Sequence, residues 1–405
     1  MSQINTQAVI LAAGKSTRIY PLTITKPKPL LKVANKPILS HNLDQMVDLV
    51  DEAVIIVGYK REKIMEYYGK EYKGIRLIYA PQNEQLGSGH ALLQAEPFIR
   101  DRFIMIVGDD LFSRVDIEAA LEYPNSAVGM KVADPSKFGV LVHENGKLIK
   151  LVEKPQEFVS DLASTGLHVF TRDIFDCLRR IEKSARGELE VSAATNLLIE
   201  KMPVQCLDTQ GYWIPIGYPW NLLQANEFLL ENLKSKVDGE VEPGAVLKGN
   251  VVIGKGTIIR SGAYIEGPTL IGENCLIAPA THIRAATSIG DNVIIGHSVE
   301  IKNSIIMDGT VINHGSYIGD SIIGEKVDIG SATIVANWRH DSKNVKSVVK
   351  AQLVDTGRQR FGTVIGDYAC TAIKTGIYPG RKIWPCMATN PGETLKTDLT
   401  NKKMD

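Results

Sequence analysis

The sequence predicts an α/β domain built on a mostly parallel sheet, followed by a coil of short parallel strands. From residue 7 to about 234, runs rich in β-branched residues alternate with helical patterns, which is typical of a sheet with helices on both faces. From residue 241 onward an aliphatic residue recurs at every sixth position, a period that neither a helix nor an ordinary strand produces. We therefore expect two domains, residues 1–235 and 236–405.

The first domain is expected to be Rossmann-like. QAVILAAG, EAVIIVG, IRLIYAPQ and RFIMIVGDD are predicted strands, and PILSHNLDQMVDL, REKIMEYYGKEY and SGHALLQAEPFI lie between them as helical patterns. Asn145-Gly146 favours positive φ angles and predicts a hairpin from Gly139 to Pro155. WNLLQANEFLLENLKS, from Trp220, predicts an amphipathic helix leading out of the domain. In such a sheet, ligands bind beyond the carboxyl ends of the strands.

The second domain is defined by its period of six. The aliphatic positions run without a miss from Val241 to Ile301, and the register shifts by one residue at Ile306. The pattern lapses from 336 to 364 and resumes at Ile365. A coil of short parallel strands explains this period, because each face then sends one aliphatic side chain into the interior.

Composition limits the possible partners. Lys plus Arg and Asp plus Glu each number 46, so there is no net basic charge to hold a nucleic acid or an anionic membrane. The five cysteines are far apart and odd in number, which favours reduced thiols. No apolar run approaches the roughly 18 residues of a membrane helix. We expect a cytoplasmic protein with no membrane partner.

The segment LAAGKSTRIYPLTITKPKPLL, residues 11–31, combines the parts that a polyphosphate needs. A glycine-containing turn follows a strand, Arg18 adds a forked cation, and prolines hold Lys26 and Lys28 in a segment expected to stay extended. It is neither a Walker A loop nor a GxGxxG turn. A solvated lysine run would explain the lysines alone, but not the whole segment.

LAAGKSTRIYPLT together with KPKPLL resembles the opening of the sugar-1-phosphate nucleotidylyltransferases. QNEQLGSGHALLQAEPF is similar to the corresponding segment of pyrophosphorylases that make UDP-N-acetylglucosamine. The resemblance spans residues 7 to about 230. It implies Mg²⁺-dependent transfer of a nucleotidyl group from UTP or dTTP to a sugar-1-phosphate, with release of pyrophosphate.

Roles for single residues follow from that chemistry and from the resemblance. Arg18 and Lys28 are candidates for steadying the α-phosphate and the departing pyrophosphate. Asp109, after the apolar run FIMIVG, matches the family's Mg²⁺ ligand, and a turn or helix cap is the alternative for it. The resemblance places four residues at the nucleotide: Ala13, Gly14, Gln82 and Gly87. It places four more at the sugar phosphate: Gly139, Glu153, Lys154 and Thr165. Glu153 and Lys154 could also be a surface ion pair.

One position departs from the family. Members often carry W-x-D-x-G-x-P, in which the aspartate is a second metal ligand, and here Pro215 stands at that place. Proline offers no side-chain oxygen. Either Asp110, Asn221 or water fills the gap, or nucleotidyl transfer is weak or lost.

The hexad ladder resembles the left-handed β-helix of hexapeptide-repeat proteins, which usually form trimers. His297 and His314 occupy the same corner of the hexad, so position alone favours neither. His314 is distinguished by its neighbours in the sequence, because Tyr317 follows it by three residues and Asn337 lies where the period of six lapses. The insert after Asn337 carries six Lys or Arg against two Asp, which suits a phosphate-bearing ligand.

This set resembles the acetyltransferase half of bifunctional enzymes, particularly an archaeal branch, that acetylate glucosamine-1-phosphate and then activate it with UTP. The resemblance implies that His314 takes the amine proton. It also implies that Tyr317, Asn337, Lys343 and Lys346 position the substrate and acetyl-CoA.

Three hypotheses remain open at this point. The first is a bifunctional enzyme with both activities, acting as a homotrimer or hexamer. The second is a nucleotidylyltransferase whose β-helix serves only for assembly. The third is a catalytically silent binding or regulatory subunit, suggested by Pro215.

Overall fold

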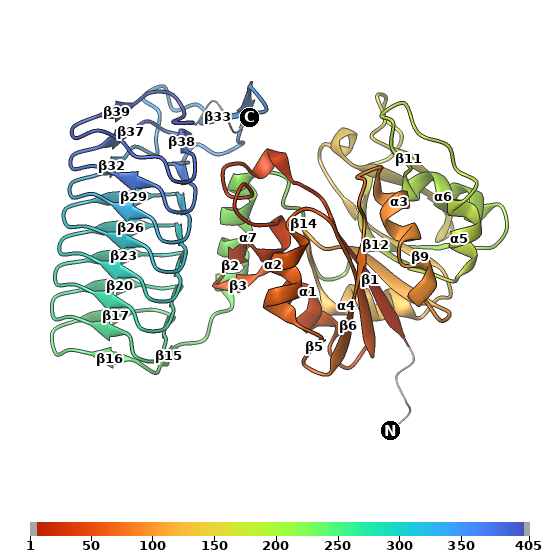
Figure 1. The fold of residues 1–405 in the computed structure, drawn as a ribbon, viewed down its shortest axis with the longest axis horizontal. Coiled ribbons are helices and arrows are strands. Elements are labelled where there is room, and N and C mark those ends of the chain that lie inside the picture. The colour runs from red at the N-terminus through yellow and green to blue at the C-terminus, as the bar shows by residue number, and fades with distance from the viewer. Residues whose placement is uncertain (1–5, 401–405) are drawn as a thin grey trace. The chain divides into compact units, whose positions relative to one another are not determined.

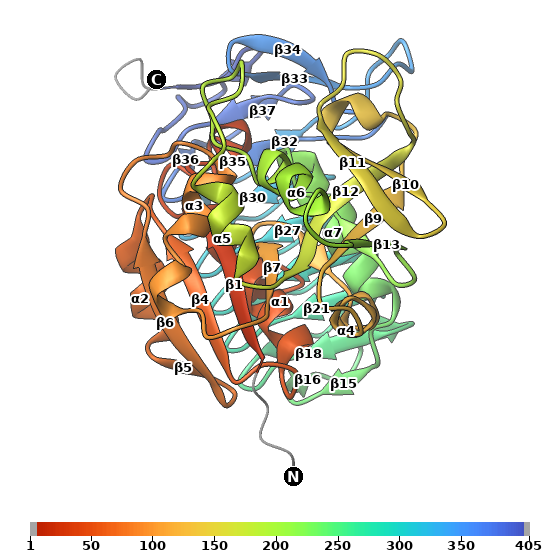
Figure 2. The ribbon, with the colours of Figure 1, turned by 90° about the vertical axis from the view of Figure 1, so that its right-hand side faces the viewer.

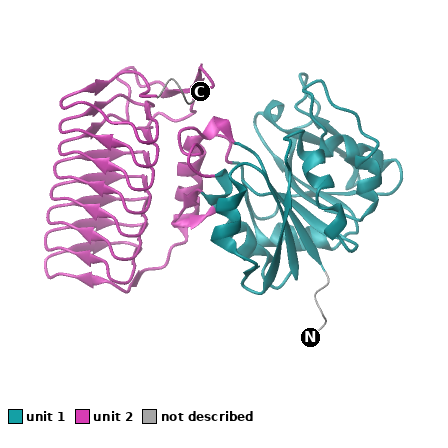
Figure 3. Ribbon diagram, viewed as in Figure 1, with its two compact units in different colours: residues 1–15, 27–30, 38–215 teal, residues 16–26, 31–37, 216–405 magenta. Residues whose placement is uncertain are grey.

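The computed structural model describes residues 6–400 and confirms the predicted fold class (Figure 1). Contacts between residues divide the chain into two compact units (Figure 3). Unit 1 comprises residues 1–15, 27–30 and 38–215, and unit 2 comprises residues 16–26, 31–37 and 216–405. The units group residues by contact, and the domain boundary after residue 235 stays a prediction.

Unit 1 is built on a twisted sheet with the strand order β10-β11-β13-β9-β12-β7-β1-β4-β6-β5. Its strands, in chain order, are β1 (Gln7–Ala12), β4 (Glu52–Val57), β5 (Glu71–Tyr72), β6 (Ile75–Pro81), β7 (Phe103–Val107), β9 (Ser126–Lys131), β10 (Gly139–Glu144), β11 (Lys147–Glu153), β12 (Leu162–Phe170) and β13 (Gln205–Asp208). The central strands β7, β1, β4 and β6 run parallel, so their carboxyl ends share one edge. A second small sheet pairs β8 (Leu111–Phe112) with β14 (Trp213–Ile214).

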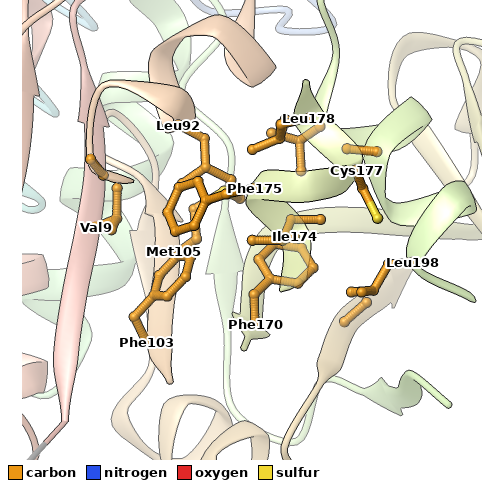
Figure 4. Close-up of a cluster of buried hydrophobic side chains, with 14 of the residues drawn as sticks. Val9, Leu92, Phe103, Met105, Phe170, Ile174, Phe175, Cys177, Leu178 and Leu198 are labelled. Carbon is orange, nitrogen blue, oxygen red and sulfur yellow. The ribbon is translucent and has the colours of Figure 1, made fainter. Parts of the chain in front are cut away.

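Helices cover both faces of this sheet (Figure 2). They are α1 (Ile38–Met46), α2 (Arg61–Tyr68), α3 (Ser88–Leu93), α4 (Arg114–Leu121), α5 (Asp173–Leu178) and α6 (Val191–Ile199), with short 3-10 turns η2 (Lys28–Leu30), η3 (Glu96–Phe98) and η4 (Pro135–Lys137). On one face Leu92, Ile174 and Leu198 pack over Val9 and Phe103 (Figure 4). On the other face α1, α2 and α4 pack over the alternate residues of the same strands.

Two local predictions can be compared directly with unit 1. The hairpin is confirmed: Asn145 and Gly146 have φ angles of 49° and 76° and join β10 to β11. The expectation that the lysine-proline segment stays extended is wrong. Lys28–Leu30 close into the 3-10 turn η2, in which the Leu30 amide donates to the Pro27 carbonyl at 3.0 Å. Pro29 fits there because a first helical turn does not need its N–H.

Unit 2 contains the β-helix, three parallel sheets of short strands stacked coil on coil (Figure 1). The first sheet holds β15 (Lys236–Val237), β18 (Val251–Ile253), β21 (Thr269–Ile271), β24 (Thr287–Ile289), β27 (Ile305–Ile306), β30 (Ile322–Ile323), β35 (Val364–Ile365) and β38 (Lys382–Ile383). The second holds β16 (Glu240–Val241), β19 (Ile258–Ile259), β22 (Leu276–Ile277), β25 (Ile294–Ile295), β28 (Val311–Ile312), β31 (Asp328–Ile329) and β36 (Cys370–Thr371). The third holds β17 (Val246–Lys248), β20 (Tyr264–Glu266), β23 (His282–Arg284), β26 (Glu300–Lys302), β29 (Tyr317–Gly319), β32 (Ile334–Val335), β37 (Gly376–Ile377) and β39 (Thr394–Leu395).

The period of six has the predicted meaning. The hexad residues from Ile253 to Ile301 point inward and are fully buried, and they form one continuous apolar column. The register shift is also confirmed, because Ile289 pairs with Ile306 across neighbouring coils. This architecture agrees with the left-handed β-helix that the resemblance implies.

Where the period of six lapses, from residue 336 to 364, the chain leaves the β-helix and forms an insert. β32 is followed by an insert whose hairpin consists of β33 (Lys346–Val349) and β34 (Gln352–Asp355). The coil then closes, since β35 pairs with β30.

Unit 2 also takes up parts of the N-terminal segment. They include the 3-10 turn η1 (Thr17–Ile19), β2 (Lys32–Val33) and β3 (Lys36–Pro37), and α7 (Pro219–Glu231) follows unit 1 in the chain. Asn226, buried on α7, accepts a hydrogen bond from the Ala34 amide (2.9 Å) and donates to the Ala286 carbonyl (3.0 Å). Helix α7 is therefore held to the β-helix by buried polar contacts. None of the helices within residues 6–400 combines the length and apolar character needed to cross a bilayer.

Candidate functional site

The carboxyl ends of the central strands in unit 1 bring together several predicted residues. Ala13 and Gly14 follow β1, Gln82 follows β6 and Asp109 follows β7 at the same edge of the sheet. Backbone packs closely here: a side chain on Gly58 would put its Cβ 2.8 Å from the Ala13 carbonyl oxygen. This is the edge where parallel α/β sheets bind ligands.

Lys28 and Asp109 form the charged centre of this edge. Lys28 Nζ lies 3.0 Å from Asp109 Oδ2 and 3.6 Å from Asp110 Oδ1. The lysine side chain is only 5% exposed, whereas that of Asp109 is 37% exposed and can reach a ligand. Two carboxylates beside one ammonium leave a net negative charge, which suits a metal cation placed next to phosphates.

Gln82 and Gly87 also meet. The buried Gln82 side chain donates from Nε2 to the Gly87 carbonyl at 3.1 Å, and the same nitrogen lies 3.1 Å from His90 Nδ1. Gly87 has φ of 108°, and a Cβ there would lie 2.4 Å from the Leu189 carbonyl oxygen. A glycine is therefore required at residue 87, and it fixes the turn against which Gln82 rests.

Arg18 belongs to unit 2, on η1. Its guanidinium carbon lies 5.3 Å from the centre of the Tyr218 ring, a cation–π contact. This contact orients the side chain without neutralising its charge. The predicted role of Arg18 at a phosphate stays a prediction.

Asp110 and Asn221 are the two side chains suggested to replace the aspartate that is missing at Pro215, and the structure gives them different contacts. Asn221 Oδ1 accepts the Tyr218 amide at 2.9 Å and so caps α7. Asp110 is held beside Asp109, where its Oδ2 accepts Trp213 Nε1 at 3.2 Å. Within residues 6–400 no group of three or more His, Cys, Asp or Glu is arranged to hold a metal ion. Of the two side chains suggested to replace the missing aspartate, Asp110 is the one with a carboxylate next to Asp109.

The sugar-phosphate candidates lie along the hairpin of β10 and β11. Gly139 pairs directly with Glu153, and a Cβ on Gly139 would lie 3.1 Å from Glu153 Oε2. Burial raises the pKa of Glu153, against the opposing effect of the cations of Lys154 and Arg186. Arg186 Nη2 lies 3.2 Å from Glu153 Oε1, and Lys154 Nζ lies 3.8 Å from the same oxygen.

This group also includes Arg186 and Thr165. Sequence reasoning missed Arg186, and its position in the polar run SARGELE gave no periodic signal. Thr165 is buried, and its hydroxyl donates to the Val128 carbonyl (2.9 Å) and accepts the Leu167 amide (3.2 Å). That hydroxyl is committed to the backbone, and a role at the sugar phosphate stays a prediction.

In unit 2 the structure brings Tyr317 and Asn337 together. Asn337 Nδ2 donates to the Tyr317 hydroxyl at 3.1 Å, although twenty residues separate the two in sequence. Burial raises the pKa of Tyr317, so the phenol stays protonated and can donate. His314 is exposed at its corner, with Nε2 3.1 Å from Ser331 Oγ in the next coil. Among residues 6–400, the ring of His297, at the equivalent corner one coil earlier, forms hydrogen bonds only with its neighbour Ser298.

The third sheet adds two cations that sequence reasoning missed. Arg284 pairs in register with Lys302, and Lys302 with Gly319. Glu300 and Tyr317 pair two residues earlier along the same strands, on the same outward face. Their signal was available: Arg284 and Lys302 are eighteen residues apart, one full coil, at the residue after an inward isoleucine.

Lys343 and Lys346 lie on the insert, and Lys346 begins β33. Both are exposed, and within residues 6–400 neither side chain takes part in an ion pair. The structure therefore leaves both ammonium groups available to a ligand, and in the described part of the chain no hydrogen bond joins either of them to Tyr317.

Comparisons with known proteins agree with this arrangement. The family model described as nucleotidyl transferase matches residues 7–232, and the one described as the GMPPB C-terminal domain matches residues 265–377. A "Bifunctional protein GlmU" of Methanococcus maripaludis is 46% identical over 379 residues, covering 93% of this chain and 91% of that protein.

One further relative covers nearly the whole chain, and one solved structure covers its first part. A bifunctional sugar-1-phosphate nucleotidylyltransferase/acetyltransferase of Sulfurisphaera tokodaii is 37% identical over 400 residues, covering 97% of this chain and 98% of that protein. A solved Bacillus anthracis structure, assigned as a glucose-1-phosphate thymidylyltransferase, superposes with a TM-score of 0.52 at 29% identity, covering 57% of this chain and 98% of that one. The chain therefore belongs to the nucleotidyl transferase family, and archaeal proteins named as bifunctional are similar to it along almost its whole length.

Proposed function

We propose that this protein is a bifunctional enzyme of nucleotide-sugar synthesis. Its β-helix transfers the acetyl group of acetyl-CoA to glucosamine-1-phosphate or galactosamine-1-phosphate. Its N-terminal domain then transfers a nucleotidyl group from UTP or dTTP to the sugar-1-phosphate and releases pyrophosphate. One observation carries the proposal. The residues suited to nucleotidyl transfer and those suited to acetyl transfer lie in one chain, which matches bifunctional relatives along 93–97% of its length.

For nucleotidyl transfer, the main requirement is to offset negative charge. The sugar-phosphate oxygen attacks the α-phosphorus while the bond to the pyrophosphate oxygen breaks, and charge spreads over the phosphoryl oxygens. Lys28, buried and fixed by Asp109, provides an ammonium that needs no rearrangement when that charge develops. Ala13, Gly14, Gln82 and Gly87 would line the nucleotide, and Gly139, Glu153 and Lys154 the sugar phosphate.

The residues present fit a magnesium ion, though with few protein ligands. Mg²⁺ commonly binds one or two carboxylates and takes its remaining ligands from substrate phosphates and water. Asp109 and, beside it, Asp110 would hold it. The ion would supply charge neutralisation for the triphosphate when bound.

For acetyl transfer, a proton must leave the sugar's amine. The amine nitrogen attacks the thioester carbon, the C–S bond breaks, and the CoA sulfur leaves with the bonding electrons and gains a proton. His314, exposed on the β-helix, would accept the amine proton. Arg284 and Lys302, stacked one coil apart beside Tyr317, would bind the substrate phosphate.

The experiment offers the purified protein UTP, dTTP, acetyl-CoA and several sugar-1-phosphates with Mg²⁺, and follows pyrophosphate and free CoA separately. We expect His314→Ala to lower CoA release by about a hundredfold or more and to leave pyrophosphate release from N-acetylglucosamine-1-phosphate unchanged. We expect Lys28→Ala to do the reverse. His297→Ala is the matched control, because it changes the equivalent corner of the preceding coil. Unaltered acetyl transfer in His314→Ala would refute the second active site.

Pro215 favours a second candidate function, nucleotide binding without transfer. That candidate expects saturable UTP or dTTP binding by calorimetry and no pyrophosphate. It also expects Pro215→Asp to create turnover by adding a carboxylate. Pyrophosphate release by the unchanged chain excludes it.

We also propose that the chain forms a homotrimer, or a hexamer of paired trimers. An outward column of aliphatic side chains runs along the second sheet of the β-helix, comprising Ile258, Leu276, Ile294 and Val311 in register. Ile294 is 44% exposed in the single chain, which is costly for a large apolar residue in such a column. Light scattering should give three or six times the chain mass of 44.4 kDa. Ile294→Glu should lower it to one, and Val246→Glu, on an outward position of the third sheet, should not.

A further inference from the structure

Asp320 is a buried carboxylate in the β-helix to which neither the sequence nor the comparisons give a role. It follows β29 directly, and its side chain is 2% exposed. Three donors surround it: Asn337 Nδ2 lies 2.5 Å from Oδ2, Lys302 Nζ lies 3.3 Å from Oδ2, and Asn303 Nδ2 lies 2.9 Å from Oδ1. A carboxylate this buried is costly to keep, so its surroundings must compensate it fully.

The contact with Asn337 determines which way that amide points. A carboxylate can only accept hydrogen bonds, so the amide nitrogen of Asn337, and not its oxygen, must face Asp320. The two hydrogens of Nδ2 are then used by Asp320 and by the Tyr317 hydroxyl. No side chain among residues 6–400 donates to Asn337 Oδ1, so the oxygen is left to accept from a ligand N–H.

The backbone at this corner supports the same arrangement. A Cβ on Gly319 would lie 2.5 Å from Asn337 Nδ2 and 2.6 Å from the Tyr317 hydroxyl, so only glycine leaves room for both. Asp320 has φ of 50°, a left-handed conformation that aspartate tolerates better than most residues. Its carbonyl accepts the Gly362 amide at 2.9 Å. Asp320 therefore contacts Asn337 at the start of the insert and Gly362 at its end.

We propose that Asp320 is a positioning residue for acetyl transfer, which fixes the Asn337 amide so that its oxygen receives the N–H of the amino sugar. It acts through Asn337, Tyr317 and Lys302 and touches no substrate itself. The negative charge of Asp320 also helps burial to raise the pKa of Tyr317. The inference rests on the proposed acetyl transfer and extends it to a residue outside the site so far described.

The test is Asp320→Asn, which keeps the shape and removes the obligatory acceptor. With glucosamine-1-phosphate and acetyl-CoA, kcat for CoA release should fall roughly ten- to a hundredfold, while KM for acetyl-CoA changes little. Pyrophosphate release from N-acetylglucosamine-1-phosphate should be unchanged, which verifies that the N-terminal domain stays intact. Asp291→Asn is the matched control, because Asp291 also follows a strand of the β-helix. Its Oδ1 accepts the backbone amide of Glu273 at 2.8 Å.

A double-variant cycle separates positioning from general stability. If Asp320 acts through Asn337, then adding Asp320→Asn to Asn337→Ala lowers kcat little further. Additive losses, or full acetyl transfer by Asp320→Asn, overturn the inference and leave the proposed function standing. Absence of CoA release from the unchanged chain with any amino-sugar-1-phosphate overturns both. Should Asp320→Asn not fold, the pair exchange Asp320→Asn with Asn337→Asp restores one acceptor and one donor, and it must exceed Asn337→Asp alone in kcat.

Discussion

Lys26 stands two residues from Lys28 in the sequence, yet it makes a structural contact inside unit 2. Its ammonium pairs with Glu325 and lies 3.1 Å from Asp367 Oδ2. The Lys26 side chain is 8% exposed and that of Asp367 is 2% exposed. The Thr25 hydroxyl also donates to Asp367 Oδ2 at 2.5 Å. We predict that Lys26→Met releases residues 16–26 from the β-helix without affecting its core.

The size of the effect follows from the surroundings of the pair. Breaking a buried ion pair costs roughly 3–5 kcal/mol, because a charge is left unpaired. Here Glu325, 30% exposed, can turn to water, and Asp367 keeps the hydrogen bonds from Thr25 and from the Glu325 amide (2.8 Å). We therefore expect a loss of about 2 kcal/mol, or roughly thirtyfold in the opening equilibrium of this segment.

Hydrogen exchange measures that opening locally. The amides of Leu22 and Ile24 donate to backbone carbonyls inside the segment, both at 3.2 Å, and should lose protection by this factor in Lys26→Met. Lys32→Met is the matched control, since Lys32 pairs with Asp308 in a more exposed place and should cost about fivefold or less. Adding Asp367→Asn to Lys26→Met should recover part of the loss. Unchanged protection in Lys26→Met, or a loss as large in the control, would refute the reasoning.

Three further predictions concern the β-helix. Ile301→Ala opens a cavity in the inward column and should lower the free energy of unfolding by about 3 kcal/mol in urea titrations, whereas Val246→Ala, outward and 45% exposed, should change it by about 0.5 kcal/mol or less. Burial lowers the pKa of Lys382 to about 8, so between pH 8 and about 10.5 the unfolded chain binds more protons, and stability should rise with pH across that window in the native chain but not in Lys382→Met. Gly319→Ala should lower CoA release by roughly a hundredfold through displacement of the Asn337 amide, with pyrophosphate release unchanged.

Sequence periodicity was sufficient for the fold because packing in both units obeys simple rules. Inward isoleucines such as Ile283 and Ile301 are fully buried as the period of six requires, and Asn145-Gly146 makes its hairpin from local φ preferences alone. The conformation at Lys28 was not predictable in this way. The prolines beside it suggested an extended chain, but the hydrogen bond from the Leu30 amide closes a turn that a window of neighbours does not reveal.

Residues of the candidate sites could be predicted only where the residue type and the local motif together indicate a chemical role. Asp109 after an apolar strand and Lys28 in a motif were predicted from the sequence, and the structure places their charged groups 3.0 Å apart. Arg186 and Asp320 were not predicted, because the partners that indicate a role for each of them lie far away in the sequence. For Asp320 the partner is Asn337, which reaches it across one coil of the β-helix.

The position of that pair follows from the repeat itself. Parallel strands in register stack equivalent residues into columns, so a regular coil repeats the same outward environment and offers no distinct site. Here the column that contains Arg284 and Lys302 continues to Gly319, where the side chain is absent. The vacated volume is occupied by the Asn337 amide and the Tyr317 hydroxyl, which would lie within 2.6 Å of a Cβ on Gly319. One coil later, after β32, the period of six breaks and the basic insert begins. A distinct site on this scaffold therefore depends on departures from the regular repeat, and Asp320 directly follows Gly319 and contacts Asn337 at the start of the insert.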